Sequence, residues 1–197
     1  MSLPLPVVDG FQLRAPLRAL LMPGAIVRDS RGRTRRLPRF FYAVDSWQTA
    51  LDTRLTSNFA LWEFIDVDLY EPLPVRTFPR YVPCAVTLLA AHLELLRIAA
   101  AAPVHIAANG GYRSPSHGRS TAGSPHSWAC AANIYRIGNE YLDDREKIEK
   151  YSVLATTLLP AARTRPYGSD PGAVDDHVHI DIGHVIAVPM ESPAEES

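Results

Sequence analysis

The histidines in the second half of the chain are the residues best suited to chemistry. Four of the seven histidines lie between residues 126 and 184. The segment Asp176–Gly183 reads Asp-His-Val-His-Ile-Asp-Ile-Gly, and in a strand its alternate side chains share a face. His177, His179 and Asp181 would then line one face, opposite an apolar one. Such a row favours a metal site or an acid–base site, and a solvated polar strand face is the alternative interpretation.

A metal site needs a further ligand, and the segment Ser124–Asn133 offers His126 and Asn133. Seven residues of helix rise about 10.5 Å, whereas ligands bind one zinc ion at about 2.1 Å. If both side chains reach one ion, the chain must bend between them. A histidine that is packed against Trp128 and hydrogen-bonded, without a metal, is the alternative.

Four segments in order resemble the motifs of the zinc D-Ala-D-Ala carboxypeptidases, a family that shares its fold with the Hedgehog signalling domain. They are Asn58–Phe64, which contains Phe-x-x-x-Glu-Phe, Gly111–Pro115, which reads Gly-Tyr-Arg-Ser-Pro, Ser124–Asn133 and Asp176–Gly183. The resemblance covers roughly residues 56 to 185, about two-thirds of the chain. It implies an α+β fold of the Hedgehog/DD-peptidase type, with a small antiparallel sheet flanked by helices.

The resemblance also implies a zinc cofactor and a set of site residues. His126, His179 and the residue at position 133 would be the metal ligands. Asp176 would be the general base acting on the zinc-bound water, and His177 would lie beside the reacting centre. Arg113 would bind a substrate carboxylate or stabilise the developing oxyanion.

General chemistry supports such an assignment. Zinc lowers the pKa of bound water and polarises a peptide carbonyl, and a carboxylate can carry the proton from this water to the leaving amine. The fork of Arg113 suits a carboxylate, and Asp181 and Ser124 could fix imidazole tautomers. The first functional hypothesis is therefore a zinc-dependent peptidase or amidase acting on peptidoglycan-like peptides, with a free carboxylate on the peptide substrate or ligand.

The chain departs from the family pattern at three places. Asn133 stands where the family has an aspartate ligand, Ala129 stands where it has glycine, and residues 117–121 lack the usual Asn and Gly-Gly. A neutral amide is a poorer zinc ligand than a carboxylate, so we expect zinc to be bound weakly, to use another ligand such as His177, or to be lost. The second functional hypothesis is a non-catalytic binding or structural module that keeps the fold with a degraded metal site.

The elements that must position these groups follow from periodicity and turn signals. Apolar residues at helical spacing predict a well-buried helix over Cys84–Ala102 and a second helix over Tyr141–Leu159. Alternation predicts a strand at Val104–Ala108, followed by a turn at Asn109–Gly111. Thr56–Asn58 is typical of a helix start. We therefore expect an α+β domain whose small antiparallel sheet carries His179.

The first part of the chain contains an arginine run with Asp29 as its only acid: Arg28, Arg31, Arg33, Arg35, Arg36 and Arg39. We interpret it as a solvated hairpin that pairs Ile26–Val27 with Phe40–Tyr42, or as a contact surface for an anionic polymer. No stacking aromatics are interleaved with the arginines, so nucleic acid is not expected as a partner. We predict an N-terminal extension over residues 1–55, packed on or flanking a domain over residues 56–188, and a disordered tail over 189–197.

Composition is that of an ordinary globular protein, with 197 residues, 47% hydrophobic residues and a net charge of −1. No apolar run approaches the roughly 20 residues that span a bilayer, so no membrane partner is expected. No signal sequence precedes the chain as written, which predicts a cytoplasmic protein unless export follows another route. Cys84 and Cys130 lack a metal-binding or redox spacing and are expected to be buried thiols. The oligomeric state is left open.

Overall fold

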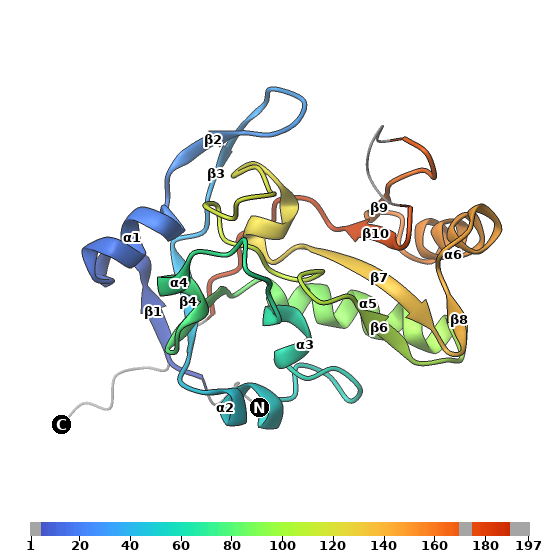
Figure 1. Cartoon of the computed structure of the whole chain (residues 1–197), viewed down its shortest axis with the longest axis horizontal. Coiled ribbons are helices and arrows are strands. Elements are labelled where there is room, and N and C mark those ends of the chain that lie inside the picture. The colour runs from blue at the N-terminus through green and yellow to red at the C-terminus, as the bar shows by residue number, and fades with distance from the viewer. Residues whose placement is uncertain (1–4, 170–174, 190–197) are drawn as a thin grey trace.

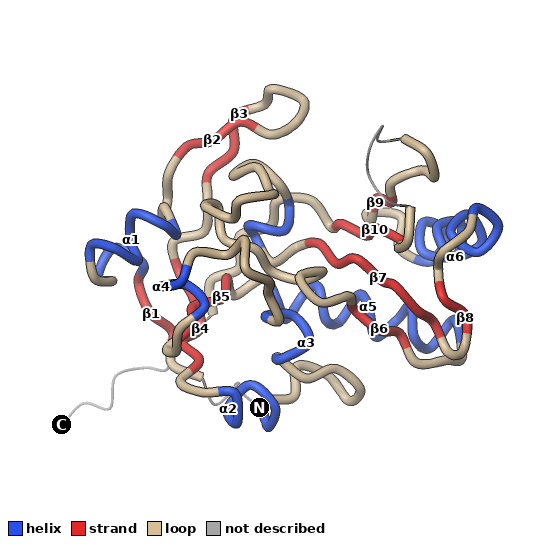
Figure 2. Tube along the Cα trace, viewed as in Figure 1, coloured by secondary structure: helices blue, strands red, loops and turns tan. Residues whose placement is uncertain are grey.

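The computed structural model describes residues 5–169 and 175–189. Its strands are β1 (Val7–Asp9), β2 (Ile26–Arg28), β3 (Thr34–Arg36), β4 (Phe40–Val44), β5 (Arg80–Pro83), β6 (Val104–Ile106), β7 (Ala131–Ile137), β8 (Glu140–Tyr141), β9 (Arg163–Thr164) and β10 (Val178–Asp181). Its helices are α1 (Ala15–Leu21), α2 (Trp47–Asp52), α3 (Trp62–Ile65), α4 (Leu73–Arg76), α5 (Val86–Ala100) and α6 (Arg145–Leu158), with 3-10 turns η1 (Gly10–Gln12) and η2 (Pro125–Trp128). Figure 2 shows how much of the chain between these elements is loop.

The largest sheet is antiparallel and has the order β6-β7-β10-β9, with β8 added to β7. On one of its faces α5 contacts β6 and β7, while α6 contacts β9 and β10 (Figure 1). Val178 and Ile180 of β10 are buried in the core on that side. The alternation of a strand then places His179 on the other face. This confirms the predicted α+β architecture and the antiparallel sheet that carries His179.

A second sheet has the order β1-β4-β5, and β2 and β3 form a separate hairpin. The predicted pairing of Ile26–Val27 with Phe40–Tyr42 is wrong, because Ile26 pairs with Arg36 and Val27 pairs with Arg35. The turn closes early, since Gly32 adopts a left-handed conformation with φ 73°. The apolar strand β4 is thereby free to lie between β1 and β5.

The two long helices occur where periodicity predicts them, with different ends and burial. α6 begins at Arg145 rather than Tyr141, because Tyr141 pairs in β8 and Asp144 caps the helix by accepting the Lys147 N–H at 2.9 Å. The expectation that α5 is well buried is only half right. One face of α5 packs in the core, while the opposite face exposes Leu88, Leu95 and Ile98.

The predicted helix start at Thr56–Asn58 has a different role in the structure. α3 begins only at Trp62, and Thr56 instead donates to the Glu94 carboxylate on α5 at 2.6 Å. The side chain of Asn58 also binds Glu94. These contacts tie the loop before α3 to α5.

The N-terminal residues are in contact with the remainder of the chain, because β4 pairs with β5 across residues 41–44 and 80–83. The proposed division at residue 55 stays a prediction, and the tail predicted at 189–197 lies, after Pro189, outside the described residues. Within residues 5–169 and 175–189, no helix has the length and apolar character needed to cross a membrane.

Candidate metal centre

The pairing of β7 with β10 brings the first two predicted site residues together. His179 lies directly opposite Asn133 in the ladder, and its Nδ1 is 2.9 Å from Oδ1 of Asn133. Asp181, two residues along the same face, has Oδ2 at 3.4 Å from Nε2 of His179. Both nitrogens of the His179 ring therefore face a polar side chain.

His126 reaches the same place from η2. The sequence predicts that this is possible only if the chain bends between His126 and Asn133. The bend occurs at Ala129, whose φ of 54° ends η2 and turns the backbone into β7. This is the position at which the resembling family has glycine, the residue that adopts such a conformation without cost. His126 is only 3% exposed, and its Nδ1 lies 2.7 Å from the Gly111 carbonyl. A carbonyl accepts, so Nδ1 carries the proton and the lone pair of Nε2 is left free.

The two imidazoles form a close pair. The ring centroids of His126 and His179 are 5.2 Å apart, with an interplanar angle of 60°. With zinc–nitrogen bonds of about 2.0–2.1 Å and tetrahedral geometry, two imidazoles on one ion have centroids roughly 5 Å apart. The separation of this pair therefore suits a shared divalent ion.

Backbone contacts between the motifs hold the pair in place. The Tyr112 N–H donates to the Phe64 carbonyl at 2.7 Å. A side chain on Gly111 would put its Cβ 2.3 Å from the same carbonyl oxygen, so only glycine permits this approach. Since the Gly111 carbonyl then accepts from His126, the segments around Phe64, Gly111 and His126 form one connected chain of contacts.

Electrostatics keep His126 in the form that binds metals. Burial, together with the positive charge of Arg113, holds the pKa of His126 well below its ordinary value. The ring is neutral at physiological pH, as a metal ligand must be. Burial also lowers the pKa of His177, against the opposing effect of the Asp176 carboxylate.

The contacts of His179 define what its Nδ1 can bind. Burial alone would raise the pKa of Asp181, but the contact with His179 and the charge of Arg163 outweigh burial and lower it. Asp181 is thus ionised and only accepts. When Nε2 of His179 carries the proton that Asp181 accepts, the lone pair of Nδ1 points at the amide of Asn133. A cation between the ring and the amide oxygen satisfies that lone pair, and so does the amide N–H if the Asn133 side chain turns over.

Asp176 and His177 lie just before β10 rather than in it, because the strand begins at Val178. The Asp176 side chain is 60% exposed, and its Oδ1 lies 2.7 Å from Nδ1 of His177. Nη2 of Arg165 lies 3.1 Å from Nε2 of His177. Both His177 nitrogens are therefore engaged, which leaves His177 poorly placed as a substitute ligand. Asp175, the neighbouring acid, accepts the Gly168 N–H at 3.1 Å.

Arg113 is half-buried beside His126. Its Nε–H donates to the Asn109 carbonyl at 2.7 Å, which aims the guanidinium. Among the described residues, no side-chain or carbonyl partner is found for the two terminal nitrogens of Arg113. Burial lowers its pKa, against the raising effect of Asp68, yet a guanidinium remains charged. The group is free to bind a carboxylate.

A polar cleft of about 440 Å³ opens beside His179 and Asp181. Its walls are the tip of the β2–β3 hairpin, the loop before η2, and β9 with the turn after it. Sequence reasoning missed the contribution of Arg163 and Arg165 to this site. Arg163 and Arg165 are two residues apart, which is the spacing of side chains on one face of a strand. Nothing in the sequence, however, indicates that this short strand pairs with β10.

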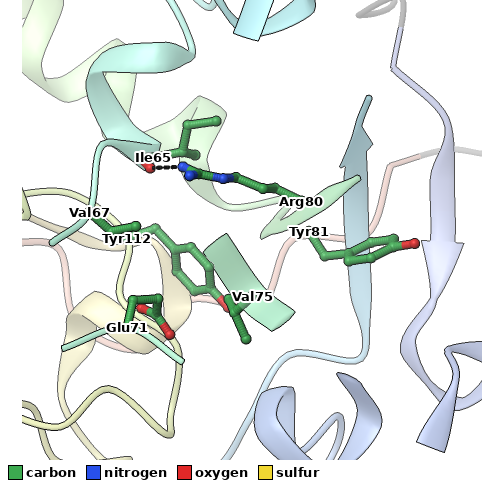
Figure 3. Close-up of a pocket in the computed structure, with 7 residues that line it drawn as sticks. All are labelled: Ile65, Val67, Glu71, Val75, Arg80, Tyr81 and Tyr112. Carbon is green, nitrogen blue, oxygen red and sulfur yellow. Dashed lines mark hydrogen bonds between the residues drawn. The ribbon is translucent and has the colours of Figure 1, made fainter. Parts of the chain in front are cut away.

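A second, much smaller cavity lies beside Tyr112 and has a volume of only about 10 Å³. Figure 3 shows the Tyr112 ring directed into this space near Glu71, while Arg80 donates to the Ile65 carbonyl. The Tyr112 hydroxyl and Oε1 of Glu71 are buried without a protein partner. The space suits about one water molecule that bridges such groups, so it is too small for a substrate.

The donor set tests whether zinc suits these residues. His126 and His179 meet the requirement for two ligands, whereas the third adjacent group is the neutral amide of Asn133. Within residues 5–169 and 175–189, no three His, Cys, Asp or Glu side chains gather in a way that could hold a metal. Two imidazoles and an amide oxygen can hold a divalent ion weakly.

Comparison with known proteins finds no matching family model, no matching curated protein and no matching solved structure.

Proposed function

We propose that the protein is a zinc-dependent peptidase or amidase of the D-Ala-D-Ala carboxypeptidase type, with the corresponding Hedgehog/DD-peptidase fold, that acts on peptidoglycan-like peptides. The observation that carries this proposal is the imidazole pair, with ring centroids 5.2 Å apart. The bend at Ala129 and the glycine contact at Gly111 support it, because both serve to bring His126 to His179.

In this proposal His126, His179 and Asn133 hold the zinc ion. Bound zinc supplies a water of lowered pKa and polarises the scissile carbonyl. Arg113 binds the terminal carboxylate of the peptide through its two free nitrogens. Asp176 holds the proton taken from the water and returns it to the leaving amine. His177 keeps the Asp176 carboxylate oriented through the 2.7 Å contact.

The alternative is a binding or structural module that keeps this fold without catalysis. The observation that favours it is the 2.9 Å contact of His179 with Asn133. An aspartate at position 133 could only accept a hydrogen bond, whereas the asparagine amide can donate one to Nδ1. Asn133 can therefore take the place of a metal as the partner of His179.

The deciding experiment measures zinc content and turnover together. Wild type is titrated with zinc and assayed on peptides that end in D-Ala-D-Ala. We expect Asp176→Ala to lower turnover by about 10²–10⁴-fold with unchanged zinc affinity, because the carboxylate serves the water rather than the metal. Asp175→Ala is the matched control and should retain most turnover, since its carboxylate is bound to Gly168.

Two outcomes would count against the enzyme. If the wild-type protein does not cleave the peptides, whether or not it binds zinc, the result favours the binding module. Turnover that survives Asp176→Ala leaves a hydrolase but overturns the role given to Asp176.

A further inference from the structure

The cleft beside His179 has an unusual charge. Four of the residues that line it are arginines, two from the β2–β3 hairpin and two from β9 and the turn after it: Arg31, Arg33, Arg163 and Arg165. Among the residues that the structure describes, two acids, Asp29 and Asp181, line the same space. The described residues that line the cleft therefore carry two more positive than negative charges, although the whole chain has a net charge of −1. Positive charges that converge on one cavity raise the local concentration of anions there.

Asp29 holds the hairpin tip in its conformation and does not cancel the positive charge of the tip. Its side chain is 3% exposed and accepts the backbone N–H groups of Arg31 and Arg33, both at 2.9 Å. It also accepts from Nε of Arg33 at 3.0 Å and from Nε of Arg35 at 3.1 Å. The carboxylate is thus satisfied inside the turn, and the turn holds its shape before any ligand arrives.

The hairpin packs closely against η2 and the loop before it, which gives the cleft a fixed wall. A Cβ on Gly123 would lie 2.1 Å from the Arg28 carbonyl oxygen, which shows how closely the two backbones approach. Nε1–H of Trp128, in η2, donates to the Arg36 carbonyl at 3.0 Å. The base of the hairpin therefore packs against the same segment that carries His126.

Arg31 is the arginine best placed to meet a ligand. Its side chain is exposed at the tip, lines the cleft, and makes no hydrogen bond or ion pair within the described residues. Arg33 uses only its Nε on Asp29, which leaves its terminal nitrogens free within the same part of the chain. Free guanidinium nitrogens bind carboxylates bidentately.

We propose that the β2–β3 hairpin gives the site its substrate preference, by binding an acidic side chain of a peptide whose C-terminal carboxylate is held by Arg113. The inference rests on the proposed function and names its substrate class as acidic peptides. A peptide is favoured over a nucleic acid, because none of the described residues that line this cleft is a Phe, Tyr or Trp that could stack on a base. The cleft also continues directly to His179, where the peptide bond would lie.

The test uses the full chain and pairs of peptides ending in D-Ala-D-Ala. In each pair one of the three preceding residues is glutamate in one peptide and glutamine in the other. Binding is measured by calorimetry on the purified protein, before and after treatment with EDTA. We expect at least one glutamate peptide to bind about 10-fold more tightly than its glutamine partner, with a preference that weakens as salt is added.

Arg31→Gln should bring this ratio close to one. Arg36→Gln is the matched control, because Arg36 lies in the same hairpin and is exposed but does not line the cleft. The control should keep the preference. Thermal melting of both variants checks that they fold. The substitution keeps the Arg31 backbone N–H that donates to Asp29, and within residues 5–169 and 175–189 the Arg31 side chain makes no hydrogen bond or ion pair that would be lost.

Three results would overturn the inference. They are equal binding of every glutamate and glutamine pair, a preference unchanged in Arg31→Gln, and tighter binding of a single-stranded oligonucleotide through Arg31. The zinc titration separates this inference from the proposed function. Zinc binding without a glutamate preference defeats the inference alone, whereas a preference that depends on Arg31 in a protein that never binds zinc defeats the peptidase and leaves an acidic-peptide binding module.

Discussion

The side chain of Asn133 lies in contact with His179 and carries no charge. Its amide oxygen can face a cation, and its amide nitrogen can instead donate to the imidazole. A carboxylate at the same place would have only the first option. Whether this site binds a cation therefore depends on the amide nitrogen of Asn133, which stands where the aspartate of the resembling family has a carboxylate oxygen.

Asn133→Asp should tighten zinc binding, because it adds a negative charge beside the ion. Zinc titration by calorimetry measures the affinity directly. Thermal unfolding in excess zinc should show a higher Tm for the variant, since a ligand that binds only the folded state stabilises it. Asn139→Asp, the same change at an exposed residue, should alter neither. Equal zinc affinity in Asn133→Asp and wild type would show that residue 133 does not face the metal.

How much of the site the sequence predicts depends on each residue's place in a strand. His179 and Asp181 follow from alternation, because β10 is a regular strand. The predicted alignment of His177 with them requires a strand that starts at Asp176, whereas β10 begins at Val178. Contacts with Arg165 and Asp176 instead determine where His177 lies, and no sequence period encodes such contacts.

At the scale of elements, the end of α5 shows a strain that a single change would relieve. Ala101 caps the helix with φ 50°, a left-handed conformation that costs a residue with a Cβ about 1 kcal/mol. Ala101→Gly should therefore raise the free energy of unfolding by about that amount. Ala99→Gly, an exposed position inside the helix, should lower it by about 1 kcal/mol. Urea denaturation measures the free energy of unfolding of both variants. If both substitutions changed it in the same direction, Ala101 would not be a strained helix cap.

The β2–β3 hairpin should be sensitive to acid. Burial alone would raise the pKa of Asp29, but its bonds to the Arg33 and Arg31 backbone and to the guanidinium groups of Arg35 and Arg33 hold the pKa well below the ordinary 3.8. A carboxyl whose pKa is depressed by folding stabilises the protein above its unfolded pKa, and this contribution is lost as the pH falls toward the folded value.

Asp29→Asn should accordingly remove part of the acid dependence. Below a pH of about 3.8, the stability of wild type should fall more steeply than that of the variant. Urea midpoints between pH 2 and pH 6 measure this difference. Asp45→Asn, at an exposed residue, should retain the wild-type slope. Parallel curves for wild type and Asp29→Asn would mean that the turn does not depend on this carboxylate.

Helices and hairpins differ in how well the sequence predicts them. The core of α5 and of α6 follows from spacing within a single segment, so periodicity finds both. The pairing of β2 depends on which of two later segments closes the turn. Phe41 is buried in a cluster with Leu13 and Leu21, and this packing, rather than any local signal, assigns β4 to another sheet.

At the scale of the whole molecule, the two cysteines belong to different clusters. Cys84 lies in the main core and Cys130 in a smaller cluster with Leu37 and Trp128. Both are free and buried, as the sequence predicted. Burial raises the pKa of each thiol to about 12. The thiolate, which is the reactive form, is therefore scarce in the folded protein at neutral pH.

Both thiols should consequently resist alkylation at pH 8 until the protein unfolds. Mass spectrometry after timed exposure to iodoacetamide measures the modification of each site. A Ser30→Cys variant adds an exposed thiol at the hairpin tip and should be labelled quickly at that site only. Because the cluster around Cys130 is the smaller one, we expect Cys130 to react before Cys84 as urea is added. Rapid labelling of either native thiol without urea would contradict this packing.

The position of β10 between β7 and β9, although it follows both in the chain, has a consequence for biosynthesis. A nascent chain displays His126 and Asn133 outside the ribosome before His179 has emerged from it. During that interval β7 presents an unpaired edge on its inner side, which other chains can join and which chaperones must shield. Insertion of the late strand closes this edge and completes the imidazole pair in one event, so a partly translated chain cannot assemble the pair.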